Sequence, residues 1–356
     1  MTLRTRTRTR LLVVSLLLAA PLAFWMPARP AAARAVEAEK TLKRRYAAAR
    51  PVIWRDPGDV RARNLFYGPG SAARSPAPPF TFIEEDRSGE SPKFEVRDAR
   101  GVRWKVKLGP EAQAETVATR LVWAAGYFAE EAYYLERVRV RGLPRLSRGR
   151  EFVSGDTARG ARFEPRRAGL VRGPTWDWSD NPFEGRRELD GLKVLMILLN
   201  NYDARAANNR VFYAGSPGRG AEARYYVADL GATLGKSDGL GGNRSKNDLP
   251  DFLSTRFVTG VEGDGSVEFD YDTRPTGLGI VSILYPPYYR GEVKKEKAMR
   301  GIPVEHAAWI GSRLARLSDA QLHDAFRAAR YDRATADGYV RALRRRINQL
   351  TRLAHR

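Results

Sequence analysis

The string Asn-Asn-Tyr-Asp-Ala-Arg-Ala-Ala-Asn-Asn occupies residues 200–209 and is followed by Val-Ala-Asp-Leu-Gly at residues 227–231. The first string contains Asp203 and Asn208 in the spacing Asp-x-x-x-x-Asn, and the second places Asp229 in an Asp-Leu-Gly. Transfer of a phosphoryl group from a nucleotide needs a carboxylate that orients the attacking hydroxyl, an amide oxygen that helps to hold Mg²⁺, and a second carboxylate on that metal. The order and spacing of these three residues meet that requirement.

The residues around the two strings predict a helix, a loop and two strands. Residues 188–199 are expected to form a buried helix, because apolar side chains recur there at helical spacing. These side chains are Leu192, Leu195, Met196 and Leu199. Asp203 then lies in the loop after a core helix. Residues 210–213 and 225–228 have the composition of short strands joined by a turn-rich segment, which places Asp229 at the end of a strand.

A β-rich region with one helix is predicted upstream. Residues 102–108 alternate apolar and charged side chains, the period-two pattern of a half-buried strand. After Gly109-Pro110, residues 111–125 carry small and apolar side chains at helical spacing up to Gly126. The other segments expected to be strands are 80–83, 93–97, 133–140 and 161–163.

The remaining segments are predicted to be connectors and a helical end. Residues 36–50 are expected to form an exposed basic helix, and residues 51–79 a loop-rich segment. Residues 165–187 are expected to be a polar connector, and residues 233–249, dense in Gly, Ser, Asp and Lys, to be mobile. The later elements are expected to be a hairpin at 257–271, a helix at 304–317, a helix opened by the capping box at 318–321, and a basic-faced helix at 335–353. Strands followed by helices indicate the α+β class.

Composition restricts the classes of function. The chain has 356 residues, of which 43% are hydrophobic, enough to bury a core in one large or two small domains. Its formal net charge of +21 favours anionic partners such as phosphates, acidic lipids or polyanionic glycans. Nucleic acid is a weaker candidate, because the sequence has no zinc-ligand spacing and no RNP-like aromatic strand. Three histidines and no cysteine argue against a histidine metal site or a cysteine nucleophile.

The N-terminus has the pattern of a secretory signal. Arginines up to Arg10 precede an apolar run, and Ala33-Arg34-Ala35 is an A-x-A cleavage site, so cleavage near Ala35 and export to the periplasm or the extracellular space are expected. The alternative is an N-terminal membrane anchor, but the apolar run at 11–26 contains Pro21 and is shorter than the roughly 20 residues of a spanning helix. Without cysteine, the chain has neither a lipid-modified cysteine nor a disulfide.

These motifs, in this order, resemble those of the atypical, HipA-like branch of the kinase superfamily. They are also similar to those of phosphatidylinositol 3/4-kinase-like proteins and of secretory-pathway kinases. The resemblance runs from about residue 80 to 235. It implies a bilobal, protein-kinase-like fold, with a small β-rich N-lobe at 80–165 and a larger, mostly helical C-lobe at 166–356, after a signal peptide at 1–35 and a lead-in at 36–79. It also implies ATP and Mg²⁺ as cofactors.

The resemblance assigns roles to residues of the N-lobe. Lys107 is similar to the strand lysine that grips the α- and β-phosphates, with Lys105 on the same strand face as the alternative. Glu115 is similar to the helix acid that pairs with this lysine, and Glu111 takes its place if the helix starts later. The turn between the first two strands resembles the nucleotide-phosphate turn, where glycine lets backbone N–H groups approach phosphate oxygens. Its candidate residues are Ser88, Gly89, Ser91 and Lys93.

The resemblance also assigns roles in the C-lobe. Asp203 is expected to orient the acceptor hydroxyl as the catalytic carboxylate, while Asn208 and Asp229 hold Mg²⁺ through hard oxygen ligands. Arg205 occupies the place where many kinases have a lysine or histidine near the transferring phosphate. Asn209 is the alternative metal ligand, although its spacing from Asp203 is one residue longer.

Two departures separate the chain from conventional protein kinases. Tyr202 precedes Asp203 where those kinases have arginine, and no Ala-Pro-Glu follows Asp229. The expected function is therefore an exported, atypical kinase-like enzyme that moves the γ-phosphoryl of ATP to a hydroxyl of a protein, lipid or glycan. The alternative is a catalytically inactive kinase-like module that binds an anionic envelope component through its basic surface, with association at a membrane surface. Neither interpretation specifies an oligomeric state.

Overall fold

Met1–Thr41 and Leu42–Arg356 form two separate units of the chain. In the computed structural model, the described residues are 30–89, 91–166, 169–239, 242–245, 247–271 and 286–354. Helix α1 (Pro30–Arg45) begins and ends earlier than the helix predicted at 36–50. The reason for the earlier end is that strand β1 already starts at Arg50.

The predicted export signal falls mostly on residues that the structure does not describe. Its apolar run, which ends at Met26, lies outside the described residues, whereas Ala35 lies within α1. Across the described segments, no helix has the length and apolar character needed to span a membrane.

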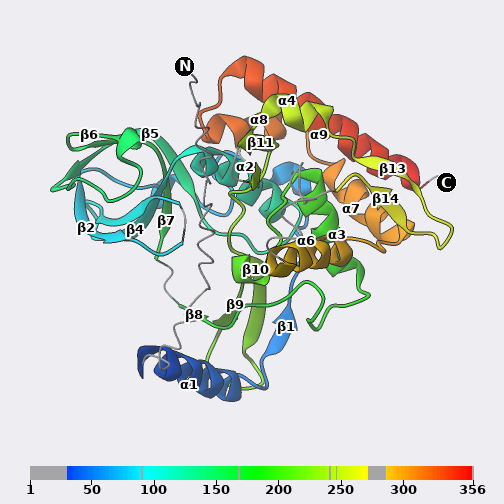
Figure 1. Cartoon of the computed structure of the whole chain (residues 1–356), viewed down its shortest axis with the longest axis horizontal. Helices are drawn as coiled ribbons and strands as arrows, with labels where there is room; N and C mark the ends of the chain where they lie inside the picture. The colour runs from blue at the N-terminus through cyan, green and yellow to red at the C-terminus, as the bar shows by residue number, and fades with distance from the viewer. Residues whose placement is uncertain are drawn as a thin grey trace, which may run out of the picture. The chain divides into compact units, whose positions relative to one another are not determined.

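Five strands of the second unit close into a small barrel (Figure 1). They are β2 (Phe80–Asp86), β3 (Lys93–Arg97), β4 (Arg103–Leu108), β5 (Tyr133–Arg141) and β7 (Thr157–Pro165). Neighbouring strands run antiparallel except for the parallel pair β2–β5, and the pairing of β4 with β7 closes the ring. The short strand β6 (Val153–Ser154) pairs with one end of β7. All five predicted strands are confirmed, and β2 and β7 are longer than predicted.

Successive side chains of β4 point alternately into the barrel and to its outer face. Trp104, Val106 and Leu108 are buried in an apolar cluster with residues of the other barrel strands. Burying a large apolar side chain contributes about 1.5–3 kcal/mol. The charged side chains between them point to the opposite face, as the period-two pattern predicts. Lys107 is among these, so the interior packing of β4 determines the direction of a candidate site residue.

Helix α2 (Pro110–Ala124) follows β4 directly and confirms the helix predicted at 111–125. Gly109 has a φ of 97°, which a glycine adopts without strain, and Pro110 begins the helix at a position where its missing N–H is not needed. The apolar face of α2 belongs to the larger core cluster that includes Val117 and Leu121. Its first turns therefore remain next to the outer face of β4.

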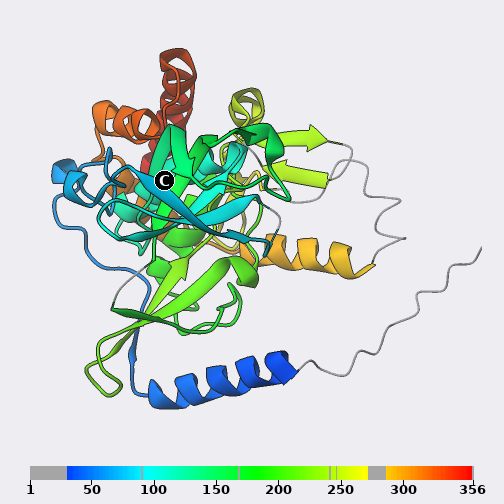
Figure 2. The same cartoon turned by 90° about the vertical axis from the view of Figure 1, so that its left-hand side faces the viewer.

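A second, four-stranded sheet adjoins the helices, in the order β1 (Arg50–Val52), β10 (Glu222–Val227), β9 (Asn209–Ala214) and β8 (Leu170–Arg172). Strands β9 and β10 confirm the two strands predicted around the turn-rich segment, and Figure 2 shows them with their connecting loop. Strands β1 and β8 come from segments expected to be loops or connectors. Ile53 and Trp176, from the same two segments, are buried in the larger core. Both segments are thus part of the packed fold.

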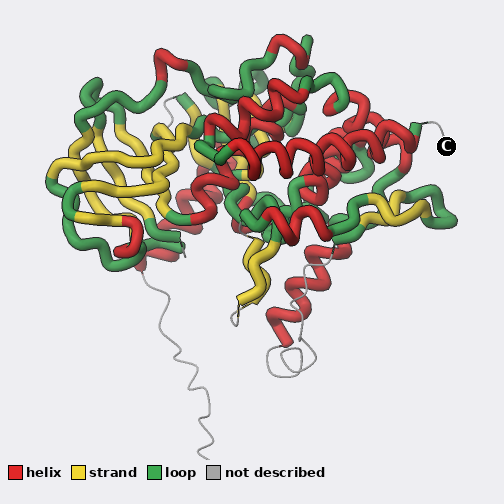
Figure 3. The backbone as a smooth tube through the Cα atoms, turned by 90° about the horizontal axis from the view of Figure 1, so that it is seen from above, coloured by secondary structure: helices red, strands yellow, loops and turns green. Residues whose placement is uncertain are grey.

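Helices form most of the rest of the second unit and lie to one side of the barrel strands (Figure 3). They are α3 (Arg187–Leu198), α4 (Leu249–Ser254), α6 (Pro286–Ala298), α7 (Val304–Leu314), α8 (Asp319–Ala328) and α9 (Arg333–Leu353). Two hairpins join them: β11 (Lys236–Gly239) with β12 (Gly242–Ser245), and β13 (Val258–Val261) with β14 (Val267–Phe269). The predicted helix before Asn200, the predicted hairpin at 257–271 and the capping box of α8 are confirmed, whereas α4 and α6 were not predicted. The fold is α+β with mixed sheets.

Candidate functional site

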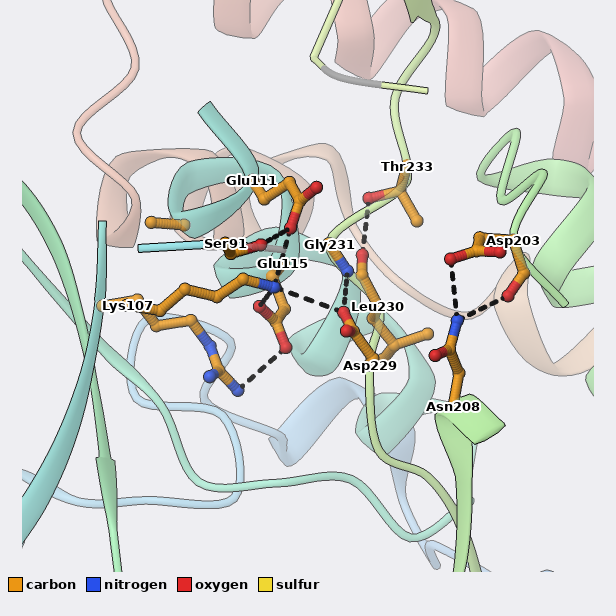
Figure 4. Close-up of polar contacts among 12 residues, drawn as sticks. Ser91, Lys107, Glu111, Glu115, Asp203, Asn208, Asp229, Leu230, Gly231 and Thr233 are labelled. Carbon is orange, nitrogen blue, oxygen red and sulfur yellow. Dashed lines mark hydrogen bonds and ion pairs between the residues drawn. The ribbon is translucent and has the colours of Figure 1, made fainter. Parts of the chain in front are cut away.

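Lys107 lies at the centre of a cluster of carboxylates contributed by α2 and by the Asp-Leu-Gly (Figure 4). Its Nζ atom is 2.8 Å from Glu111 Oε2, 3.1 Å from Glu115 Oε2 and 3.3 Å from Asp229 Oδ1. Only 8% of the Lys107 side chain is exposed, compared with 48% of Asp229. Lys107 points outward from β4, and α2 follows β4 after a short connection, so the strand lysine meets the helix acids. Asp229, which lies 122 positions further along the chain than Lys107, joins them.

Charge interactions determine the protonation of this cluster. Burial opposes the charged form of Lys107, but Glu115, Asp229 and Glu111 outweigh it and hold the pKa of Lys107 above its ordinary value. Partial burial opposes the charged form of Asp229, yet the Lys107 ammonium and the backbone N–H of Gly231 hold the pKa of Asp229 below its ordinary value. At neutral pH the cluster therefore contains a charged lysine and a charged Asp229.

The structure distinguishes between the alternative lysines and places both alternative acids. Lys105 Nζ is 4.0 Å from Glu164 Oε2, so Lys107 rather than Lys105 contacts the predicted helix acid. Glu111 and Glu115 both contact Lys107, one turn of α2 apart. The predicted pair of Lys107 with Glu115 forms, and Glu111 adds a second carboxylate to the same ammonium group.

Arg162 of β7 forms an ion pair with Glu115 through the carboxylate oxygen that Lys107 does not contact, and it was not predicted from the sequence. Its side chain is 2% exposed, with Nη2 at 3.3 Å from Glu115 Oε1 and Nη1 at 2.9 Å from Glu164 Oε2. Burial would lower the pKa of Arg162, but Glu115, Glu164 and Glu130 raise it above its ordinary value. Arg162 is the cross-strand partner of Lys107, so only the register of β4 with β7 could have revealed it.

The turn between β2 and β3 supplies the remaining N-lobe candidates, and its residue Glu90, which was not a candidate, lies outside the described residues. Gly89 has a φ of 63°, which explains the glycine at this position. Ser91 Oγ donates a hydrogen bond of 2.7 Å to Glu111 Oε2, which connects the turn to the Lys107 cluster. Ser88 bonds to Asp86 within the turn, and Lys93 Nζ is 3.9 Å from the same carboxyl group. Ser91 therefore reaches the cluster, whereas Ser88 and Lys93 remain at Asp86.

The loop after α3 fixes Asp203. Asn201 Oδ1 accepts a 3.0 Å hydrogen bond from the backbone N–H of Asp203. Arg205 contacts the Asp203 carboxylate with two nitrogens, one of them Nη2 at 2.6 Å from Oδ2. Asp203 remains 26% exposed, so part of its carboxylate stays accessible. Arg205 is thus paired with the predicted catalytic carboxylate.

Asn208 links this loop to the Asp-Leu-Gly. Its Nδ2 donates to Asp203 O at 2.8 Å and to Asp203 Oδ2 at 2.9 Å, and its backbone oxygen accepts the N–H of Asp229 at 3.2 Å. The close-up shows Asn208 between Asp203 and Asp229, with its side-chain oxygen on the side of Asp229 (Figure 4). Asn209, the alternative ligand, is buried and donates to Trp176 O at 3.1 Å. Asn208 is therefore the better placed of the two.

The donor set is suited to Mg²⁺ but does not form a complete protein cage. No group of three or more His, Cys, Asp or Glu side chains suited to a metal ion occurs in the described part of the chain. The Asp229 carboxylate and the Asn208 amide oxygen are hard ligands, and Mg²⁺ commonly uses one or two protein ligands with water and substrate phosphates. These two residues thus fit a metal bound together with a nucleotide.

Gly231 permits the close approach of the Asp-Leu-Gly to α2. A Cβ atom at this position would lie 2.9 Å from Lys107 Nζ and 3.0 Å from both Cβ and Oε2 of Glu111. We expect Gly231→Ala to lower the free energy of unfolding by about 1–3 kcal/mol, because the added methyl group must displace one of these side chains. Urea denaturation followed by tryptophan fluorescence measures the loss. Gly263→Ala is the control, since its Cβ would meet no atom within 4 Å; equal losses in the two variants would contradict the crowding argument.

Known proteins do not provide an independent assignment of this site. Comparisons of the chain with models of protein families, with curated proteins and with solved structures find no match. Any assignment of function therefore depends on the arrangement of the side chains themselves.

Proposed function

We propose that the protein is an atypical kinase-like phosphotransferase that uses ATP and Mg²⁺ to phosphorylate a hydroxyl group. One observation carries the proposal: Lys107 Nζ contacts both Glu115 and Asp229, residues drawn from a helix and from a distant Asp-Leu-Gly. This is the lysine, acid and metal-ligand set that kinase-type phosphoryl transfer requires. The second unit contains a β-barrel with its own apolar cluster and a helical part with another. This division supports the interpretation of the fold as bilobal and kinase-like.

In this mechanism the residues of the chain bind and orient the reactants. Lys107 binds the α- and β-phosphates, and Glu115, held by Arg162, positions the Lys107 ammonium group. Asp203 orients the acceptor hydroxyl and accepts its proton, while Asn208 fixes the direction of the Asp203 carboxylate. Asp229 and Asn208 would hold Mg²⁺, which would supply positive charge to neutralise the phosphates.

Magnesium-dependent stabilisation by ATP is the direct test of nucleotide binding. We expect ATP with Mg²⁺ to raise the melting temperature by several degrees, because a ligand at a hundred times its Kd adds about 2.7 kcal/mol of stability. Asp229→Asn should lose the magnesium-dependent part of the shift. Asp264→Asn, an exposed change in the β13–β14 hairpin, should keep it. The same shift with and without Mg²⁺ in the unmodified protein would contradict the proposal.

A catalytically inactive module that binds an anionic envelope component is the second candidate. The exposed basic side chains of α6, including Lys294 and Lys297, favour it, since they can bind an anion without the carboxylates that contact Lys107. The same thermal-shift assay separates the two candidates. Stabilisation by an anionic lipid or glycan without Mg²⁺, and none by ATP, favours the inactive module. Export of the protein, which the N-terminal signal pattern predicts, is part of both proposals.

A further inference from the structure

A groove lies beside the loop that carries Asp203. It consists of two adjoining cavities of about 170 and 430 Å³, which share Trp178, Lys294 and Ala298 in their walls. The smaller cavity is lined by residues directly after Asp203, among them Arg205, and the larger one extends along α6. A molecule in this groove would therefore lie next to the predicted catalytic carboxylate.

The walls of the groove are strongly basic. Six cationic and two acidic side chains line the two cavities. Three of the cationic residues, Lys294, Lys297 and Arg300, recur every third residue along and just beyond α6, and all three are exposed. Lys294 is paired with Asp177 at 2.7 Å, but this pair is exposed, so a competing carboxylate can replace Asp177 at little cost.

Trp178 belongs to the wall that the two cavities share. Its side chain is 2% exposed, and its indole nitrogen Nε1 is buried with no acceptor among the described residues. Trp178 is therefore a packed part of the wall, and the basic side chains are the groups that a ligand can reach.

We propose that this groove binds an acidic peptide segment of a protein acceptor and so presents a neighbouring hydroxyl to Asp203. This inference rests on the proposed function and adds a substrate class to it. The Cβ atoms of residues three apart on a helix are about 5–6 Å apart, comparable to the spacing of alternate side chains of an extended peptide, about 6.6 Å.

The form of the groove favours a peptide over other polyanions. A membrane surface is flat and cannot follow concave walls. The smaller cavity begins at residues 204–206, directly after Asp203, so a peptide in the groove can carry the hydroxyl that Asp203 orients, which free phosphate cannot.

The test uses the full chain and a labelled peptide with one serine followed by alternating glutamates, compared with the same peptide carrying glutamine. Fluorescence anisotropy without nucleotide measures affinity. We expect the glutamate peptide to bind, and the variant Lys294→Gln/Lys297→Gln to bind it about tenfold more weakly. Arg341→Gln/Arg345→Gln removes the same charge from an exposed face of α9 and should bind as the unmodified protein does.

The alternative outcomes also decide whether the groove binds an acidic peptide. Equal affinity of the unmodified protein and Lys294→Gln/Lys297→Gln overturns the assignment, as does equal affinity for the glutamate and glutamine peptides. Binding of anionic vesicles that is lost in Lys294→Gln/Lys297→Gln, without peptide binding, assigns the groove to lipid and also overturns it. Binding of the peptide at the groove without phosphate transfer from ATP supports the groove and counts against the phosphotransferase instead.

Discussion

Replacing Asp203 with asparagine is expected to lower the rate of phosphoryl transfer by about a thousandfold while leaving the binding of ATP with Mg²⁺ intact. A positioned base contributes about 10²–10⁴ in rate, and asparagine cannot accept the proton of the hydroxyl. The side-chain oxygen of asparagine can still accept the hydrogen bond from Asn208 Nδ2, now 2.9 Å from Asp203 Oδ2, so the loop should keep its form. Incorporation of labelled phosphate measures the rate.

The contrast between two carboxylates makes this experiment specific. Asp203 contacts Arg205 and Asn208, whereas Asp229 contacts Lys107. Asp203→Asn should therefore lower kcat with little change in the KM for ATP, while Asp229→Asn should affect both. Asp264→Asn serves as the control for loss of an exposed carboxylate. Transfer by Asp203→Asn at the unmodified rate would remove Asp203 from the mechanism.

The segment around Asp203 was the most predictable part of the fold, because its signals are local. Apolar spacing specified α3, the polar pair Asn200-Asn201 ended it, and the loop with Asp203 and Asn208 followed within a few residues. Alternation in β4 likewise specified the outward direction of Lys107, since a period of two separates the faces of a strand. Such patterns need no knowledge of distant partners.

Features that depend on distant pairing could not be predicted. Arg162 reaches Glu115 only because β7 pairs with β4 in a register that closes the barrel. Strand β1 has only three residues, and it is a strand because it pairs in parallel with β10, about 170 residues later along the chain. Helix α6 carries mostly polar residues without a clear apolar stripe, so periodicity gave no signal for it. The basic groove beside α6 was missed for the same reason.

Arg346 shows how such a distant contact supports the site. It extends from α9 and is 4% exposed, and its guanidinium donates to Leu198 O and Asn200 Oδ1 at 2.7 Å and to Phe252 O at 2.8 Å. Asn200 has a φ of 52°, the left-handed conformation that commonly ends a helix. Burial lowers the pKa of Arg346 to about 10, so the group stays charged at neutral pH. It thereby caps α3 where the chain turns toward Asp203.

Arg346→Met is accordingly expected to lower the free energy of unfolding by about 3–5 kcal/mol, since three buried acceptors lose their donor at about 1–3 kcal/mol each. Methionine keeps an apolar stem of similar length, so the loss reports mainly on the hydrogen bonds. Arg345→Met, a change at the exposed neighbour on α9, should alter stability by less than about 0.5 kcal/mol. Urea unfolding followed by circular dichroism measures both. Equal midpoints for the two variants would mean that the end of α3, and with it the position of Asp203, does not depend on this guanidinium.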